Sequence, residues 1–228
     1  MKTTAIIQAR LGATRLPNKM LLHLHGMPVI EWVYRRVSSA KHLDSVLMAL
    51  PDGYQDDLLA RYLESLGAVV FRGSETDLVD RFHAAAHAVN ADTVVRICAD
   101  NPLIAASEID RLIEFYFSHP CDYAYNHIPR RNSYPDGLGA EICSISLLDE
   151  IKSKAISLSH REHLFNYVWD HREHYDIKTF DPPDSLAHPD LKLDLDTIDD
   201  YANLLAMAIS PEMSAEEIVK AAIQTRYS

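Results

Sequence analysis

Residues 6–19 of the chain read IIQARLGATRLPNK, and this stretch decides the predicted fold. An apolar run from Thr4 to Ile7 stops at Gln8, and the loop that follows carries two arginines, a lysine, a threonine, a glycine and a stiffening proline. A strand that ends in such a loop is typical of α/β proteins, which bind ligands at the carboxyl edge of the sheet. The stretch therefore predicts an α/β protein with a ligand site at this loop.

The residue types in the loop suit the binding of several phosphate groups. Arg10, Arg15 and Lys19 supply positive charge, Thr14 supplies a hydroxyl donor, and Gly12 lets backbone N–H groups approach a ligand closely. Neither a Walker A loop nor a G-x-G-x-x-G fingerprint is present. A solvated basic loop between two core elements is the alternative that the residues alone leave open.

The segment from Gln8 to Lys19 resembles the signature loop of the CMP-sugar synthetases, which include acylneuraminate and 3-deoxy-manno-octulosonate cytidylyltransferases. Within that family it is most similar to the branch of the spore coat polysaccharide protein SpsF. The resemblance implies a cytidylyltransferase that holds the triphosphate of CTP in this loop. It assigns catalytic roles to Arg10, Arg15 and Lys19, and nucleotide contacts to Gln8, Ala9, Gly12 and Thr14.

Composition and charge limit the classes of protein that fit. The chain has 228 residues, 47% of them hydrophobic, which is enough for a globular domain with a full core. The net charge of −11 would repel a nucleic acid backbone, so no nucleic acid partner is expected. Its three cysteines form no C-x-x-C pair, and no apolar run suits a signal peptide or a membrane span. We therefore expect a cytoplasmic protein with no membrane contact.

Hydrophobic periodicity in the first half predicts alternating strands and helices. Alternation of this kind predicts βαβ units on a mixed, mostly parallel sheet, as in Rossmann-like nucleotidyltransferases. The strands are expected at 45–50, 68–71 and 93–98, and the helices at 29–40, 54–66, 78–89 and 107–118.

The pattern changes after residue 118, although the chain still reads as one domain, 1–228. Residues 119–175 are interpreted as an insertion, and the resemblance implies that this region makes a homodimer contact and helps to close the sugar pocket. A strand and a long loop are expected within 119–139. Further strands are expected at 140–145, 176–180 and 191–195, and helices at 147–155, 161–171, 198–209 and 215–224.

Three aspartates are predicted to bind Mg²⁺. Asp100 follows the strand at 93–98, and Asp194 and Asp196 fall on the same face of the strand expected at 191–195. Mg²⁺ takes one or two carboxylates together with phosphate oxygens and water. Octulosonate-type enzymes match at Asp100 and Asp196, and sialate-type enzymes match at Asp194 and Asp196. A turn at Asp100 and a helix N-cap at 196–197 are the structural alternatives.

A second nucleotide-binding segment is expected at residues 71–82, which resemble the SpsF branch. The resemblance places Ser74 near the base or ribose and assigns Asp80 and Arg81 to the nucleotide as well. The alternative is a well-capped helix, with Ser74 or Thr76 as its N-cap.

The acceptor is expected to be an acidic sugar or a related acid. Segments 134–141 and 159–163 resemble the SpsF branch, and a guanidinium group suits a carboxylate or phosphate. The alternative for the second segment is a capping box from Ser159 to Glu162. The expected acceptor contacts are Tyr134, Asp136, Glu141, Arg161 and His163.

Two histidines have the spacing of zinc ligands. His83 and His87 lie four residues apart on a predicted helix, but the sequence offers no third ligand in a matching context. A zinc site is therefore kept as a minor alternative.

The predicted reaction is Mg²⁺-dependent transfer of CMP from CTP to an acidic acceptor, with release of pyrophosphate, in surface glycan synthesis. One alternative is a glycosyltransferase whose metal motif is Asp194-x-Asp196. Another is a nucleotide-binding protein without catalytic activity.

Overall fold

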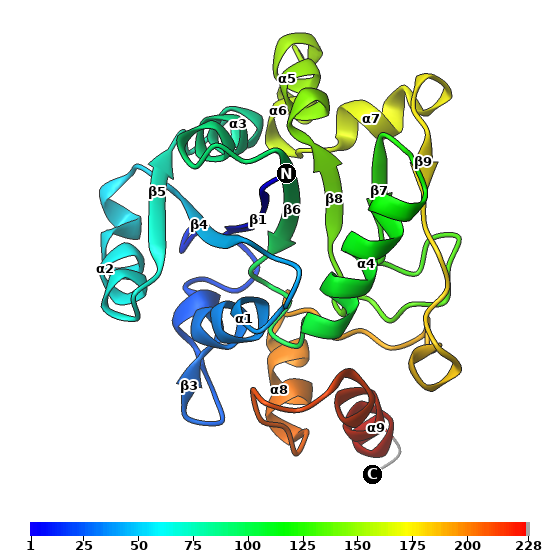
Figure 1. Cartoon of the computed structure of the whole chain (residues 1–228). Coiled ribbons are helices and arrows are strands. Elements are labelled where there is room, and N and C mark those ends of the chain that lie inside the picture. The colour runs from blue at the N-terminus through cyan, green and yellow to red at the C-terminus, as the bar shows by residue number, and fades with distance from the viewer. Residues whose placement is uncertain (227–228) are drawn as a thin grey trace.

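A seven-stranded mixed sheet forms the centre of the computed structural model, which describes residues 1–226 (Figure 1). The strand order is β5-β4-β1-β6-β8-β7-β9, and the pairs around β1 are parallel whereas β8 is antiparallel to both of its neighbours. The strands are β1 (Thr3–Gln8), β4 (Ser45–Pro51), β5 (Val69–Gly73), β6 (Thr93–Cys98), β7 (Tyr123–Tyr125), β8 (Glu141–Ser144) and β9 (Ile177–Lys178).

Helices cover both faces of this sheet. Successive side chains of a strand point to opposite faces, and in the central strands both sets are apolar and need cover. In β1, Ile6 packs into one hydrophobic cluster, whereas Ala5 and Ile7 pack into another on the opposite face. The cluster around Ala5 and Ile7 is covered by α1 (Val29–Ser38), α2 (Asp57–Ser65), α4 (Ala106–Ser118) and α9 (Ala215–Arg226). The cluster around Ile6 is covered by α3 (Leu78–Ala88), α5 (Ile145–Lys154) and α7 (Asn166–Asp170).

The first four parallel strands end at the same edge of the sheet, where the loop after β1 begins. In Figure 1 the arrowhead of β6 points toward the side of the molecule that holds α8 (Ile198–Ala206). A two-stranded hairpin, β2 (His23–Leu24) and β3 (Met27–Pro28), connects the loop to α1. This arrangement confirms the predicted α/β fold with a mixed, mostly parallel sheet.

The region predicted as an insertion contributes to the main sheet. Strands β7 and β8 both fall within 119–175, and β8 pairs directly with β6. Helix α5 packs on α3. These contacts integrate 119–175 into the central fold, whereas its role as a dimer contact stays a prediction.

Two predicted elements are wrong. The helix expected at 161–171 is two short helices, α6 (Leu158–Glu162) and α7, because His163 has an extended backbone with φ −129° and ψ 111°. The strand expected at 191–195 is not formed, because this segment contributes only an isolated bridge between Lys192 and Asp136. Alternating apolar residues at 191, 193 and 195 are buried there without a continuous strand partner.

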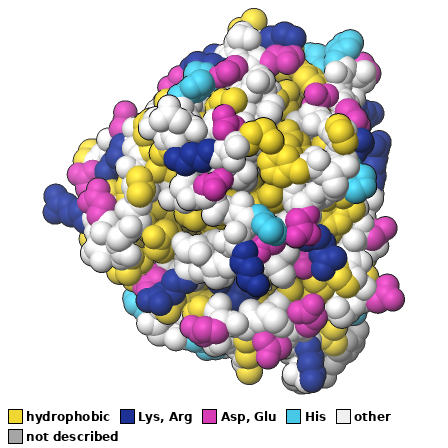
Figure 2. Space-filling model, viewed as in Figure 1, with side chains coloured by type: hydrophobic (Ala, Val, Ile, Leu, Met, Phe, Trp, Pro, Cys, Tyr) yellow, Lys and Arg dark blue, Asp and Glu magenta, His cyan; other side chains and the backbone are white. Residues whose placement is uncertain are grey.

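Surface charge of both signs is distributed over the face shown in Figure 2, where acidic and basic side chains are interspersed. The negative net charge is therefore not gathered into one acidic field on this face. None of the helices within residues 1–226 is both long enough and apolar enough to cross a membrane.

A buried arginine joins three parts of the fold. Arg36 of α1 donates hydrogen bonds to the carbonyl oxygens of Ile104 at 2.6 Å, Pro211 at 2.8 Å and Met213 at 2.9 Å. Burial lowers the pKa of this guanidinium to about 10, against the opposing influence of Glu212. Arg36 therefore connects α1 to the segment before α4 and to the chain that leads into α9.

Replacing this arginine should destabilise the protein. Arg36→Leu leaves three carbonyl oxygens without their charged donor, so the free energy of unfolding should fall by about 2–4 kcal/mol. Arg35→Leu is the control, because Arg35 is an exposed neighbour that pairs with Glu31 and should cost about 1 kcal/mol or less. Urea unfolding of both variants measures the difference, and equal losses would contradict the role given to Arg36.

Candidate functional site

The loop after β1 is held in shape by hydrogen bonds to the backbone of Leu11. The Leu11 N–H donates to Asp56 Oδ1 at 2.7 Å, and the Leu11 carbonyl accepts from the N–H groups of Ala13 at 2.8 Å and Asn18 at 3.2 Å. Asn18 adopts the left-handed conformation, with φ 57°, which closes the loop before Lys19. The residues between these anchors, including Gly12, are largely exposed.

Two cations from this loop meet carboxylates at the edge of the sheet. Lys19 Nζ donates to the Leu195 carbonyl at 2.7 Å and lies 3.0 Å from Asp196 Oδ1 and 3.4 Å from Asp100 Oδ2. A guanidinium nitrogen of Arg15 lies 2.8 Å from Asp196 Oδ2. The structure thus brings together four residues that the sequence analysis assigned separately to phosphates and to a metal.

The side chain of Lys19 is only 11% exposed, whereas that of Arg15 is 68% exposed. Lys19 is thus buried although it belongs to a loop whose other cations are exposed. The ammonium group is buried because it satisfies two carboxylates and a carbonyl at once. Arg10 lies on the exposed side of the loop, close enough to Arg81 to lower the pKa of that guanidinium, which burial lowers more strongly.

Backbone hydrogen bonds hold the acidic segment in place where a strand had been expected. Leu195 N–H donates to the Asp100 carbonyl at 2.7 Å, and Leu193 N–H donates to the Asp136 carbonyl at 2.9 Å. A Cβ atom added to Gly137 would lie 2.9 Å from Asp194 N, so this position must be glycine, which also has φ +89°. Asp136, expected at the acceptor, is thereby placed beside the predicted metal ligands.

The acidic cluster, defined as Asp100, Asp136, Asp194 and Asp196, gathers four carboxylates close enough to interact electrostatically. Burial raises the pKa of Asp136 to about 6, and the neighbouring carboxylate of Asp194 adds to the rise. Burial also raises the pKa of Asp194. Lys192 Nζ lies 3.4 Å from Asp194 Oδ1 but only 2.7 Å from Asp200 Oδ2, so its stronger contact is with another acid.

These acids fit a hard divalent cation. Every side-chain ligand in the cluster is a carboxylate oxygen, and Mg²⁺ prefers oxygen. Within residues 1–226, Asp100, Asp194 and Asp196 do not bring three ligand oxygens within 4.8 Å of one another. One or two carboxylates completed by water and phosphate oxygens therefore match the arrangement better than a cage of three.

Gln8, at the end of β1, is connected to a buried network under the loop. Its side-chain oxygen accepts from Arg96 Nε at 3.0 Å, and Arg96 forms an ion pair with Glu141. Tyr123 donates its hydroxyl to the same carboxylate. Glu141 had been expected to bind the acceptor, but it is 4% exposed and supports Arg96 and Gln8 from within the sheet. Ala9 is also buried.

Two further residues expected at the acceptor have partners within the chain. Tyr134 is fully buried, and its hydroxyl donates to Glu108 Oε2 at 2.6 Å, so its side chain has no access to a ligand. A guanidinium nitrogen of Arg161 lies 3.3 Å from Asp77 Oδ2. The residues around Arg161 could not predict this contact, because Asp77 is distant in sequence. His163 is exposed at the end of α6.

Two of the three helix caps differ from the alternatives considered in the sequence, and the third, at 196–197, is confirmed. Ser157 caps α6 by accepting from the His160 N–H at 3.2 Å, so Ser159 is not the cap. Asp77 caps α3, so neither Ser74 nor Thr76 does. At 196–197 the cap is Thr197, which forms a capping box with Asp200.

The three residues expected at the nucleotide from segment 71–82 point in different directions. The Ser74 carbonyl accepts from Arg81, which is 4% exposed. Asp80 forms an ion pair with Lys152 of α5 instead. The structure therefore places Ser74 and Arg81 together, near the loop, and directs Asp80 toward α5.

Sequence reasoning missed Lys192 and His127. Lys192 lies two residues before Asp194, a charge alternation that could have identified it. His127 is buried, with Nε2 3.8 Å from Glu141 Oε2, and burial lowers its pKa against the opposing influence of Glu141. Nothing in the stretch around His127 predicts this position, because the contact depends on how β7 and β8 pair.

Comparisons with known proteins agree with this fold. Residues 4–176 match the family described as cytidylyltransferase. The spore coat polysaccharide biosynthesis protein SpsF of Bacillus subtilis is 30% identical over 223 residues, which cover 94% of this chain and 91% of SpsF.

Solved structures extend the similarity to the whole chain. A cytidylyltransferase from Leptospira borgpetersenii serovar Hardjo-bovis has a TM-score of 0.90 and 28% identity, covering 100% of this chain and 96% of that one. The CMP:2-keto-3-deoxy-manno-octonic acid synthetase complexed with CTP has a TM-score of 0.69 at 18% identity, covering 90% and 98% of the two chains, and shares the fold. With its family match over most of its length, the chain belongs to the cytidylyltransferases and is an enzyme of the nucleotidyltransferase type.

Proposed function

We propose that this enzyme transfers CMP from CTP to an acidic sugar or a related acid, with release of pyrophosphate. The observation that carries the proposal is the contact of Lys19 and Arg15 with the acidic cluster at the carboxyl edge of β1 and β6. A nucleoside triphosphate with its divalent cation could bind to both groups of residues, the loop cations and the carboxylates. The phosphates would take the loop cations, and the acids would take the metal.

The loop residues supply binding and charge neutralisation for the transfer. Arg10, Arg15 and Lys19 would hold the phosphates and stabilise the negative charge that develops as the α-phosphorus is attacked and pyrophosphate leaves. Gly12 has open space where a side chain would be, and Thr14 is exposed, so phosphate oxygens can approach the loop from solvent. The buried Leu11 anchor keeps the loop in place while its exposed residues bind.

Asp196, with Asp194 or Asp100, would hold Mg²⁺. When bound, this cation neutralises phosphate oxygens and lowers the pKa of an acceptor hydroxyl. Burial and the neighbouring carboxylates of Asp196 and Asp100 raise the pKa of Asp194, which supports this assignment, since carboxylates placed close together favour a cation between them. Relatives named for polysaccharide biosynthesis support a role in making surface glycans. Homodimerisation and a cytoplasmic location remain predictions.

A pyrophosphate-release screen tests the function. The four nucleoside triphosphates are combined with a panel of acidic sugars and phosphorylated acids, with neutral sugars as controls. We expect pyrophosphate only with CTP and an acidic acceptor. Sugar nucleotides are assayed in parallel, and their consumption without pyrophosphate release would indicate a glycosyltransferase instead. Tight CTP binding without turnover would indicate a non-catalytic protein.

Asparagine variants of the acids test the metal assignment. Asp196→Asn should lower kcat/KM by at least about a hundredfold, because it removes a ligand of the charge-neutralising cation. The second variant that loses activity then identifies the second ligand. Loss of activity in Asp194→Asn indicates a sialate-like site, and loss of activity in Asp100→Asn indicates an octulosonate-like site. Asp199→Asn, an exposed acid in the first turn of α8, is the control. Full activity of Asp196→Asn would rule out this metal site.

The raised pKa of Asp136 predicts a pH-dependent stability. Its pKa is about 6 in the folded chain and about 3.9 when unfolded, so the folded state binds the proton more tightly. Stability from this group is complete below about pH 4 and is lost as the pH rises to about 6. Asp136→Asn should therefore be more stable than the wild type at pH 8, with a smaller difference at pH 4.

Urea unfolding at both pH values measures this effect. Asp184→Asn, which changes an exposed acid, should show no such pH-dependent difference. A constant difference between Asp136→Asn and the wild type from pH 4 to pH 8 would contradict the electrostatic origin.

A further inference from the structure

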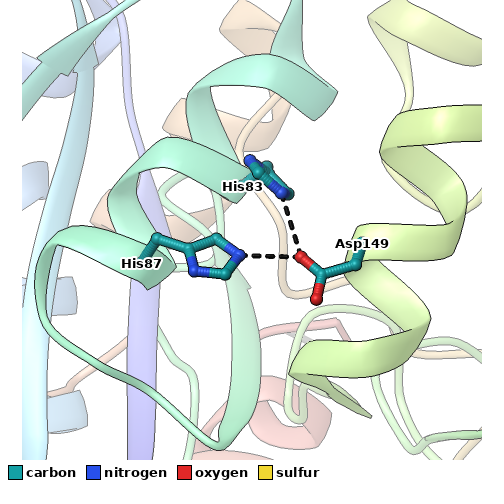
Figure 3. A group of neighbouring side chains, drawn as sticks. All are labelled: His83, His87 and Asp149. Carbon is teal, nitrogen blue, oxygen red and sulfur yellow. Dashed lines mark hydrogen bonds and ion pairs between the residues drawn. The ribbon is translucent and has the colours of Figure 1, made fainter.

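Helices α3 and α5 carry a group of side chains that the proposed reaction does not use. His83 and His87 extend from α3 toward Asp149 of α5, and all three meet between the helices (Figure 3). Asp149 Oδ1 lies 3.0 Å from His83 Nε2 and 2.7 Å from His87 Nε2. The third ligand that the sequence did not reveal is therefore supplied by a helix some sixty residues further along the chain.

The group has the geometry of a ligand set. Residues four apart lie on the same face of a helix, so both imidazoles can reach one ion. Within residues 1–226, these three side chains meet a simple criterion for a metal site: their ligand atoms all lie within 4.8 Å of one another. The side chains of His83, His87 and Asp149 are 27%, 50% and 48% exposed, so an ion can enter from solvent.

We propose that His83, His87 and Asp149 bind a divalent transition metal ion, with Zn²⁺ as the expected ion, at a surface site that joins α3 to α5. Two imidazole nitrogens and a carboxylate oxygen are ligands that Zn²⁺ accepts, and water completes a tetrahedron. Imidazole ligands discriminate against Mg²⁺, which prefers oxygen. The site is thus chemically distinct from the acidic cluster.

Without metal, His87 forms a hydrogen bond with Asp149, and the imidazole of His83 lies within ion-pair distance of the same carboxylate oxygen. A metal ion would replace the protons that mediate these contacts. Lys152 and Asp80 already form an ion pair between the same two helices. The metal would add a second cross-link on α3, whose N-terminal cap, Asp77, contacts Arg161. Its expected effect is on stability.

Calorimetric titration with ZnCl₂ at pH 7.5 tests the site, with excess MgCl₂ present so that the acidic cluster does not compete for zinc. We expect one zinc ion per chain. His87→Ala and Asp149→Asn should each weaken binding by at least about tenfold, because each removes a ligand while leaving an exposed position on a helix. His42→Ala is the matched control, since His42 is an exposed histidine that pairs with a single carboxylate, Glu114.

Thermal unfolding provides a second measurement. Zinc at about a hundredfold excess over Kd should raise the wild-type Tm by roughly 5–10 °C, and this shift should be lost in His87→Ala and kept in His42→Ala. The proposal is overturned if the wild type binds no zinc, or if binding and the Tm shift persist in both His87→Ala and Asp149→Asn. It is also overturned if they disappear in Asp196→Asn, which would place the ion in the acidic cluster.

Discussion

The contact between Lys19 and the segment around Asp196 joins the start of the chain to a segment almost at its end. Its ammonium group is buried against two carboxylates and the Leu195 carbonyl, and such a group is stable only when its charge and donors are satisfied. The loop after β1 and the acidic cluster therefore depend on each other for position. Because both signs of charge occur together, the proposed binding of a phosphate chain together with a cation would supply each charged group with a partner of opposite sign.

The charged side chains of this site differ in how deeply they are buried. Lys19 and Asp194 are mostly enclosed, whereas Arg15 is mostly exposed, so the site has a fixed inner side and an adaptable outer side. An exposed arginine can move from Asp196 to a ligand at little cost, because surface ion pairs contribute little stability. The enclosed lysine keeps the loop positioned meanwhile. This division suits a reaction in which positioning and charge neutralisation provide most of the catalysis.

Local patterns predicted most of the fold, because strands such as β1, β4 and β6 are short apolar runs separated by amphipathic helices. The loop cations and the three aspartates could be singled out from the resemblance of their segments, and the structure brings Arg15 and Lys19 together with Asp100 and Asp196. Their roles toward phosphate and metal stay predictions. Contacts between distant segments were not predictable. The pairing of Arg161 with Asp77 and the burial of Glu141 against Arg96 depend on tertiary packing, and an alternating pattern at 191–195 could not reveal that no strand partner is available.

Tertiary packing buries two of the side chains that had been assigned to the acceptor, and this limits how an acceptor could be bound. Tyr134 and Glu141 were assigned to the acceptor because segment 134–141 resembles the SpsF branch, yet in the structure both side chains are buried and satisfy other buried groups. Asp136, from the same region, instead completes the acidic cluster. The region between β7 and β8 therefore contributes Asp136 to the acidic cluster, which is the side of the site proposed to bind the metal. An acidic acceptor would then have to be bound by cations outside this cluster, because four carboxylates close together repel an anion unless a metal ion lies between them.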